Sequence, residues 1–358
     1  MDRRSADARH HRLIQPRLGL WTSAALLAAL PGAAWAQEHT NERAPEAKGV
    51  FSLAVENDSL SSGADRNYTS GIKLAYVSPA EGVPDWLRGA GEFTRAISGS
   101  SPNFWGMAIG QSIFTPEDIS ANPAPADQHP YAGWLYMQIM LGVEEDRSDG
   151  RSPRYLDTYE LEFGVTGPWA QGEESQRGIH EWLGAPDPQG WDSQLENEFA
   201  FAVSMDRRWR AVRAFIDVPG GLEFDLTPSV GATLGTLRTE ARLGAIARLG
   251  WRIDNDYGPP RVRPSLSGVE HFSGGRLSWS IFAGVQGRAV ARNLFLDGNT
   301  WEDSASVDRN TWVGDFQTGF SVSAGDWRLA YTYVWRTEEF STQPTRQDFG
   351  ALAISVRL

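Results

Sequence analysis

Apolar and polar residues alternate along several segments of this chain, and this two-residue period limits its fold more than any other feature. From 327 to 336, one set of alternate positions holds Trp327, Leu329, Tyr331, Tyr333 and Trp335. The other set holds Arg328, Ala330, Thr332, Val334 and Arg336. Successive side chains of a β-strand point to opposite faces, so the segment predicts a strand with one apolar and one polar face.

Such strands occur in soluble sandwiches and in membrane barrels, and the aromatic positions separate the two. Trp327 and Trp335 lie eight residues apart, which is roughly 26 Å along a strand. This spacing places one tryptophan near each membrane interface, as in the aromatic girdles of transmembrane barrels. The pattern therefore favours a barrel, with Arg328 and Arg336 facing its lumen.

About twelve segments carry a strand pattern. They run approximately over 51–58, 68–78, 104–114, 133–145, 155–167, 195–213, 224–235, 239–253, 276–293, 311–323, 326–337 and 348–358. An even number suits a bacterial barrel with both chain ends in the periplasm. We therefore predict an all-β fold, a transmembrane antiparallel β-barrel of about 12 strands.

The start of the chain has the composition of an export signal. Five arginines precede a mostly apolar run from 18 to 30, and Ala34-Trp35-Ala36 supplies a small-x-small cleavage site. We assign 1–36 to a signal peptide, 37–48 to a polar, disordered lead-in and 49–358 to the barrel. No later stretch approaches ~20 uninterrupted apolar residues. These features predict a bacterial outer-membrane protein, which we expect to be a monomer.

Charge and cysteine content exclude several classes of function. The formal net charge is −12, the opposite of what a nucleic-acid-binding protein needs. The chain has no cysteine, which excludes disulfides, thiolate metal sites and a cysteine nucleophile.

The connection 168–194 contains the only convincing helix of the sequence. From 172 to 184, Ile179, Trp182 and Leu183 form an apolar stripe, and Gly184 is a good helix end. If the chain starts in the periplasm, this helix follows five membrane crossings and therefore lies in an extracellular loop. His180 on it has the chemistry of a general base, and Gln176 lies one turn earlier on the same face. The alternative is an ordinary polar residue beside an amphipathic stripe.

Three oxygen-bearing side chains, Glu56-Asn57-Asp58, end the first predicted strand at the same outer end. Hard oxygen ligands in a short loop are typical of a Ca²⁺ site. The alternative is a hairpin tip, where asparagine and aspartate are common for conformational reasons.

Several spaced blocks of the first half resemble the outer-membrane lipid A 3′-O-deacylases. The blocks are Glu56-Asn57-Asp58, Asp65-Arg66-x-Tyr68-Thr69-x-Gly71, Ile113-Phe114-Thr115-Pro116, Pro130-Tyr131-Ala132-Gly133, Gly164-Val165-x-Gly167-Pro168, Gln176-x3-His180-x3-Gly184 and Gly190-Trp191-x2-Gln194-Leu195-x-Asn197-Glu198. Over the second half, the resemblance is limited to the barrel pattern.

The resemblance implies a twelve-stranded enzyme that uses calcium to hydrolyse the 3′ acyloxyacyl ester of lipid A in lipopolysaccharide. By position, His180 corresponds to the catalytic base and Gln176 to a neighbouring site residue. Asn57, Asp58 and Thr69 correspond to the metal and oxyanion cluster.

The chain also departs from that family at two positions. Ala121 stands near a lysine that some members carry after the third strand. Asp127-Gln128-His129 stands where an Asp-Arg pair is common. Two other functions stay open at this point. One is a passive outer-membrane pore or structural barrel, and the other is a calcium-dependent outer-membrane phospholipase with a serine nucleophile.

Overall fold

The computed structural model of this chain describes residues 48–58, 67–80, 82–145, 155–216, 218, 221–253, 272 and 277–358. The elements are β1 (Val50–Asn57), β2 (Asn67–Val77), α1 (Asp85–Arg88), α2 (Gly91–Ser98), β3 (Phe104–Thr115), β4 (Ala132–Glu144), β5 (Tyr155–Thr166), the 3-10 turn η2 (Gly167–Ala170), α3 (Gly172–Leu183), the 3-10 turn η3 (Trp191–Ser193), β6 (Glu198–Trp209), β7 (Val212–Ile216), β8 (Leu222–Gly235), β9 (Arg238–Trp251), β10 (Ser278–Asn293), α4 (Leu294–Asp297), β11 (Trp312–Ala324), β12 (Trp327–Arg336) and β13 (Gln347–Arg357). The predicted signal peptide and all of the lead-in except its last residue lie outside the described residues. Across those ranges, no helix combines the length and apolar character needed to cross a membrane.

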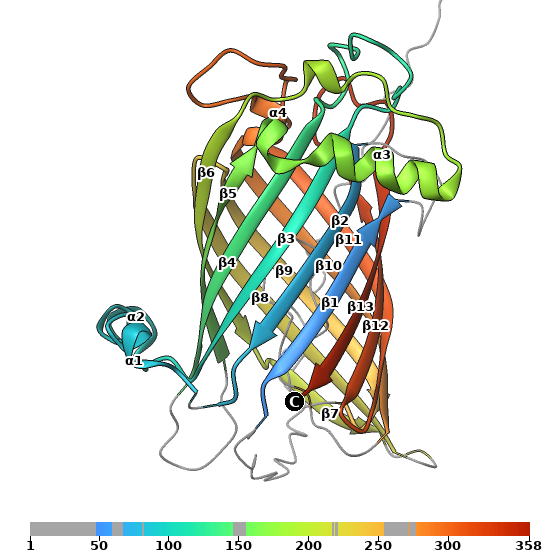
Figure 1. The fold of residues 1–358 in the computed structure, drawn as a ribbon. Coiled ribbons are helices and arrows are strands. Elements are labelled where there is room, and N and C mark those ends of the chain that lie inside the picture. The colour runs from blue at the N-terminus through green and yellow to red at the C-terminus, as the bar shows by residue number, and fades with distance from the viewer. Residues whose placement is uncertain are drawn as a thin grey trace, which may run out of the picture. The chain divides into compact units, whose positions relative to one another are not determined.

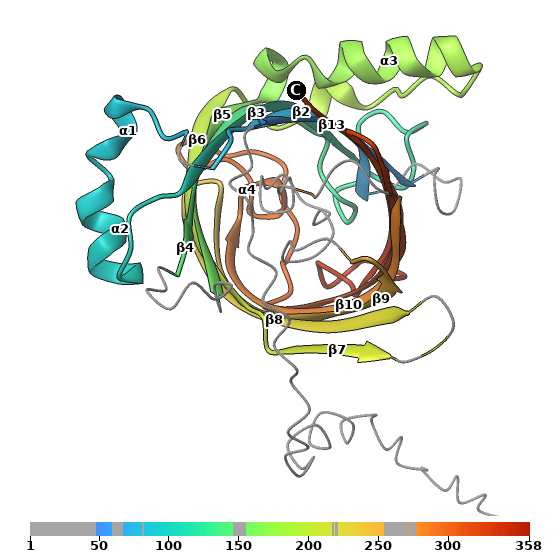
Figure 2. The same cartoon turned by 90° about the horizontal axis from the view of Figure 1, so that it is seen from below.

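Twelve of the strands close into a barrel. Neighbouring strands pair antiparallel from β1 to β6 and from β8 to β13, and β6 pairs with β8. The first and last strands complete the ring, with Val50 opposite Arg357 and Asn57 opposite Gly350 (Figures 1 and 2). The predicted twelve-stranded antiparallel barrel is confirmed. We call the end that holds Asn57 and Gly350 the rim, and the end that holds Val50 and Arg357 the terminal end.

The predicted single strand over 195–213 is wrong, because this segment forms two strands. β6 stays in the barrel, whereas the short strand β7 pairs only with β8 beyond the ring. Along β8, the partner changes from Arg208 at Ser229 to Val212 at Leu226. Pro228 lies between these two positions and has no amide hydrogen to donate, so the ladder is interrupted there.

The two faces of the wall differ as the alternation predicts. On β12, Arg328 and Arg336 are buried inside the barrel, while Trp327 is exposed on the outer face. Trp335 lies on the same outer face near the rim, against Phe316 with ring centroids 5.1 Å apart. The two tryptophans thus lie at opposite ends of one strand. The outer face of the other strands is also apolar, including Leu53, Leu74, Ile109, Met137, Leu161, Phe201, Leu243 and Ile281.

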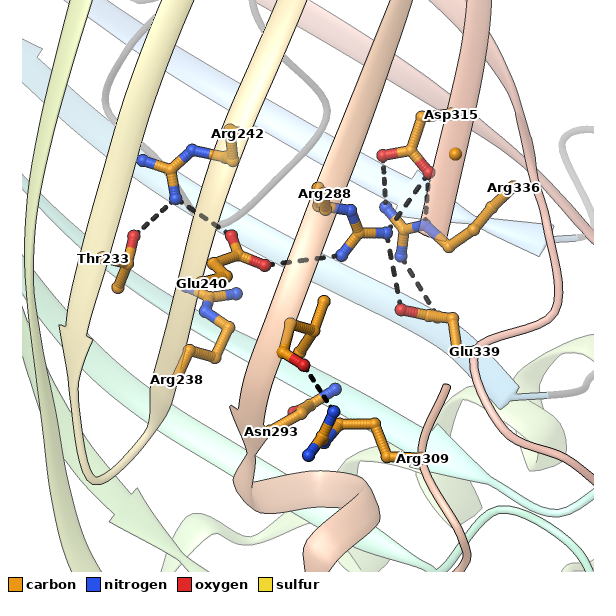
Figure 3. A network of polar contacts seen from close by, with 12 residues as sticks. Thr233, Arg238, Glu240, Arg242, Arg288, Asn293, Arg309, Asp315, Arg336 and Glu339 are labelled. Atoms are coloured by element: carbon orange, nitrogen blue, oxygen red, sulfur yellow. Dashed lines mark hydrogen bonds and ion pairs between the residues drawn. The ribbon is translucent and has the colours of Figure 1, made fainter. Parts of the chain in front are cut away.

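Charged side chains inside the barrel neutralise one another. Arg288 on β10 lies 3.8 Å from Glu240, 3.3 Å from Asp315 and 3.5 Å from Glu339 (Figure 3). Arg336 also pairs with Asp315, at 2.8 Å. Buried charges require such partners, because an unpaired ion is costly to remove from water.

The rim end of the lumen is filled by apolar side chains. Phe295 of α4 stacks on Phe114 of β3 with ring centroids 4.3 Å apart, and it also contacts Trp134. These residues belong to a larger buried cluster that includes Leu195, Ala200, Leu237 and Leu294. Figure 2 shows α4 inside the ring of strands.

Besides α3, the structure has three shorter helices that the sequence did not indicate, α1, α2 and α4. The first and last of these have four residues and α2 has eight. Such short segments give little helical periodicity in a sequence. The predicted helix 172–184 is confirmed as α3, and Gly184 ends it in the left-handed conformation with φ 69°.

Candidate functional site at the rim

The end of β1 brings Asn57 and Asp58 to the rim. Asn57 is the last residue of the strand and lies opposite Ser70 of β2 and Gly350 of β13. Asp58 follows directly and is completely buried. A buried carboxylate at a strand end is unusual for a hairpin tip, where aspartates are ordinarily solvated. This favours the functional interpretation of the pair.

Thr69 lies at an irregularity of the next strand. The register between β2 and β3 shifts between Tyr68 and Ser70, so Thr69 is the additional residue of a bulge. Its hydroxyl lies 2.6 Å from that of Thr115, and both residues are buried. Thr115 lies an even number of positions after Met107 and Ile109 of β3, whose side chains face outward, so it belongs to the same face of the strand. The bulge therefore turns Thr69 toward the outer side of the wall.

The start of α3 is fixed to the outer face of β3 and β4. Gln111 of β3 donates from Nε2 to the carbonyl oxygens of Ala170 at 2.7 Å and Gln171 at 3.1 Å. Gly133 of β4 faces Gly172, and a Cβ on Gly133 would lie 3.1 Å from the Cα of Gly172. Two glycines permit this close approach. Both views show α3 along the outside of the wall, beside the rim ends of β2 and β3 (Figures 1 and 2).

Gln176 is buried on the face of α3 that looks away from solvent. Its Oε1 accepts a hydrogen bond from Trp191 Nε1 at 2.8 Å. Within the described part of the chain, its Nε2 has no hydrogen-bond partner. A buried amide donor without a partner is costly, and such a group is a candidate for contact with a ligand.

His180 lies one turn after Gln176 and is also buried, with 5% of its surface exposed. Its Nδ1 is 2.5 Å from the carbonyl oxygen of Pro186. Because a carbonyl oxygen can only accept, we assign a hydrogen to Nδ1. The basic lone pair is then on Nε2, as a general base requires.

The apolar stripe of the same helix faces outward. Ile179, Trp182 and Leu183 are 44%, 84% and 62% exposed. In a soluble protein this stripe would be buried and His180 would face water. Here the arrangement is reversed, as expected for a helix at the boundary with lipid.

Two other aromatic residues in the rim loops are buried. His129 stacks on Phe114 with an interplanar angle of 5°, and burial lowers its pKa. Tyr131 packs on Trp191 at 4.8 Å, and burial raises its pKa to about 12. Both therefore stay neutral near pH 7. Tyr131 and Trp191 pack in one buried cluster with Ile113, so Tyr131 supports the loop that covers this part of β3.

The structure thus places all five predicted residues at the rim. Thr69 and the start of α3 lie on the outer side of the wall, and α3 contacts both β3 and β4. That His180 approaches Asp58 and Thr69 to within reach of one water or ester group stays a prediction. Asp65 and His271 lie outside the described residues. The supporting roles of Gln111 and Thr115 were not predicted, because their contacts join segments distant in the sequence. The role of Pro186 was not predicted because it is made by a backbone carbonyl oxygen, which leaves no side-chain signal.

Within the described ranges, no group of three or more His, Cys, Asp or Glu side chains is placed to hold a metal ion. Among the predicted site residues, Asn57 and Asp58 offer amide and carboxylate oxygens as metal donors. Their chemistry fits a hard cation such as Ca²⁺, which also accepts backbone carbonyl oxygens and water.

Comparison with known proteins gives a family and a fold. A family model described as "Outer membrane protein LpxR" matches residues 20–358. The solved structure "LpxR from Salmonella typhimurium" is 22% identical, with a TM-score of 0.69, and the match covers 86% of this chain and 99% of that one. The β domain of the Bordetella autotransporter BrkA is 9% identical with a TM-score of 0.38, and the match covers 88% of this chain and 99% of that one. No curated protein matches.

Proposed function

The chain belongs to the LpxR outer membrane protein family, and from this premise we propose that it hydrolyses an acyl ester of lipid A in the outer leaflet. The observation that carries this proposal is the orientation of α3. Its polar face, with His180 and Gln176, is buried toward the outside of the barrel wall, and its apolar stripe is exposed. A site on this side of the wall is accessible to a lipid without entry into the lumen.

The proposed reaction is the attack of water on the ester carbonyl carbon. His180 Nε2 takes a proton from the water as its oxygen bonds to that carbon. The same nitrogen returns the proton to the alkoxide that leaves when the C–O bond breaks. The products are a fatty acid and a lipid A hydroxyl group. A positioned base of this kind typically contributes ~10²–10⁴ in rate.

Gln176 and Thr69 have positioning and charge-stabilising roles in this proposal. The unpartnered Nε2 of Gln176 is a donor for the ester or for its developing oxyanion. The Thr69 hydroxyl, already within hydrogen-bond distance of Thr115, is a second donor. One donor to an oxyanion typically contributes ~10²–10³.

We further propose that Asn57 and Asp58 hold calcium. A bound Ca²⁺ would supply positive charge to the ester oxygen or to an anionic group of lipid A. The carboxylate of Asp58 would supply a negatively charged oxygen ligand to this cation. We assign the 3′ acyloxyacyl ester as the bond that is cleaved, on the basis of the sequence blocks around these residues.

The filled lumen counts against a passive pore. Phe295, Phe114 and Trp134 pack together inside the rim end, and arginine–carboxylate pairs occupy the wall below. A phospholipase with a serine nucleophile has less support, because the family model that matches this chain is that of the LpxR outer membrane proteins. Each of these functions predicts unchanged lipid A.

The test is mass spectrometry of lipid A from cells with and without this protein. The proposal expects loss of mass equal to one acyloxyacyl group at the 3′ position. Unchanged lipid A, together with release of fatty acid from phospholipids, would establish a phospholipase instead.

A further inference from the structure

The segment α1–α2 lies outside the barrel wall at the terminal end, opposite to α3 (Figures 1 and 2). It connects β2 to β3 and has no part in the proposed reaction. Leu87 and Ala90 pack beside Trp105 and Met205 against a buried cluster of the wall, formed by Leu141, Val143 and Tyr159. The segment is therefore attached to the barrel and is not a free loop.

One face of α2 binds the wall through polar groups. Gly91, Thr94 and Ser98 are its buried residues. The Ser98 hydroxyl donates to the Asp157 carboxylate and lies 2.6 Å from the Tyr159 hydroxyl. Tyr155 donates to the Ser98 carbonyl oxygen at 2.9 Å.

A second face of α2 is apolar and largely exposed, although the edge of Phe93 packs against Tyr159 with ring centroids 5.6 Å apart. Phe93 and Ile97, one turn apart, are 58% and 46% exposed. Trp86 of α1 is 65% exposed and packs edge-on against Trp105 with ring centroids 6.2 Å apart. A helix on a soluble protein turns such residues inward, whereas this helix turns serine and threonine inward.

A third face of α2 carries Glu92 and Arg95, both exposed. At 100° per residue, these two lie on the side away from Phe93 and Ile97. The helix thus has one side toward the protein, one apolar side and one charged side. This division suits a helix that lies in the plane between lipid and water.

The wall beside α2 is the lipid-facing surface of the barrel. Leu161 of β5 and Val203 of β6 are exposed on it. Asp157 and Arg207 lie four positions from Leu161 and Val203 on the same strands, so they share this outer face, nearer the terminal end. They form an ion pair with bonds of 2.6 and 2.5 Å. Asp157 is completely buried, because α2 covers it. The apolar band therefore ends where α2 begins.

We propose that α1–α2 is a phospholipid-binding foot, with Trp86, Phe93 and Ile97 among the acyl chains of the leaflet that faces the periplasm. The apolar face of the foot continues the apolar band of the wall, so both contact the same leaflet. Glu92 and Arg95 face the periplasmic water. The inference depends on which end of the barrel faces the periplasm and is independent of ester hydrolysis.

Because the chain has no cysteine, a single introduced cysteine can be spin-labelled without labelling any other position. Nitroxides are attached to Phe93→Cys and Ile97→Cys, with Glu92→Cys and Arg95→Cys as matched controls on the charged face. The full-length barrel is reconstituted in phosphatidylethanolamine–phosphatidylglycerol vesicles. Collisions with molecular oxygen and with a water-soluble nickel chelate are then measured by electron paramagnetic resonance.

The proposal expects labels at 93 and 97 to collide several-fold more with oxygen than with the chelate, and labels at 92 and 95 to show the reverse. Equal access of the chelate to all four positions would overturn it. Spin–spin broadening at 93 and 97 that grows with the protein-to-lipid ratio would also overturn it, since a second copy would then cover the face.

A second measurement separates lipid contact from folding. The double variant Phe93→Ser, Ile97→Ser should expose a label at Trp86→Cys to the chelate, while the matched variant Ala96→Ser should not. Heat-modifiable migration reports that both variants still form the barrel. An unchanged label environment in the double variant would contradict the role of these side chains. Release of fatty acid from lipid A should be the same in both.

Discussion

Helices α2 and α3 lie outside the same wall at opposite ends of the barrel, and each turns polar residues inward and apolar residues outward. Their buried polar groups differ. Those of α2 are engaged within the protein, because Ser98 bonds to Asp157 and Tyr159, and Asp157 pairs with Arg207. On α3, Gln176 keeps a buried donor without a partner in the described part of the chain. A completed polar network anchors a helix, whereas an incomplete one points to a ligand.

The largest expected effect tests the metal at the α3 end. Chelation with EGTA should abolish deacylation, and Ca²⁺ should restore it, because Asn57 and Asp58 offer hard oxygen donors. Asp58→Ala should also abolish activity while the barrel still assembles. The measurement is release of fatty acid from purified lipid A, with heat-modifiable migration as the folding control. Full activity in the chelator would remove calcium from the proposal.

The second prediction compares one polar residue from each helix. His180→Asn should lower turnover by ~10² or more, because the base is lost. Ser98→Ala on α2 should leave turnover unchanged and lower the midpoint of thermal unfolding. Comparable turnover in the two variants would mean that α3, like α2, is only anchored by its buried residues.

Gln176→Glu gives a finer test of the unpartnered donor. The carboxylate can still accept the hydrogen bond from Trp191 Nε1, so the loop contact is kept. The Nε2 donor is lost, and turnover should fall by ~10², the lower end of what one donor to an oxyanion contributes. Single-turnover assays at saturating lipid A measure this step. A variant with normal turnover would limit Gln176 to its contact with Trp191.

Asp157→Ala should destabilise the α2 end without affecting chemistry. It removes the partner of Arg207 and of Ser98, at a cost of about 1–3 kcal/mol in the free energy of unfolding. Asp326→Ala is the matched control, because this carboxylate is exposed in its pairs with Lys48 and Arg357, and exposed pairs contribute ~0–1 kcal/mol. Urea unfolding in detergent micelles gives both values. Equal destabilisation would show that burial by α2 adds nothing to the Asp157 pair.

The smallest effect concerns pH and His129. Burial lowers the pKa of this imidazole below its ordinary value near 6.5, opposed by Glu339 and the Pro130 carbonyl oxygen. The folded state thus favours the neutral ring. The contribution of His129 to the free energy of unfolding is therefore fully present above about pH 6.5, and it falls as the pH drops toward the lowered pKa. His129→Phe should keep the stacking on Phe114 and lose part of this acid sensitivity. Heat-modification midpoints at pH 7.5 and pH 5.5 measure it.

Much of the barrel could be predicted from the sequence because each strand carries its own two-residue period. Arg328 and Trp327 illustrate this, since their adjacent positions alone place one inside and one outside. Helix α2 could not be predicted, because its eight residues give little periodicity and Ser98 contacts β5, about 60 residues away.

The candidate site could be predicted only in part, because some of its contacts join segments that are distant in the sequence. Asn57, Asp58, Thr69, Gln176 and His180 were found from their spacing in resembling blocks. Their support was not, because the bond from Gln111 to Ala170 and the one from Trp191 to Gln176 join segments that only the fold brings together. The unpartnered amide of Gln176 is likewise a property of packing.

The pairing of β1 with β13 has a consequence for the order of folding. The bond between Ser52 and Ser355 joins residues 303 positions apart, so it closes nearly the whole chain into one loop. Closing so long a loop costs conformational entropy, and this cost is smaller when the intervening hairpins have already formed. Asn57 and Asp58 lie on one side of this seam. Because β1 also pairs with β2 over its full length, a nascent barrel can bring Asn57 to the rim beside Ser70 before its first and last strands meet.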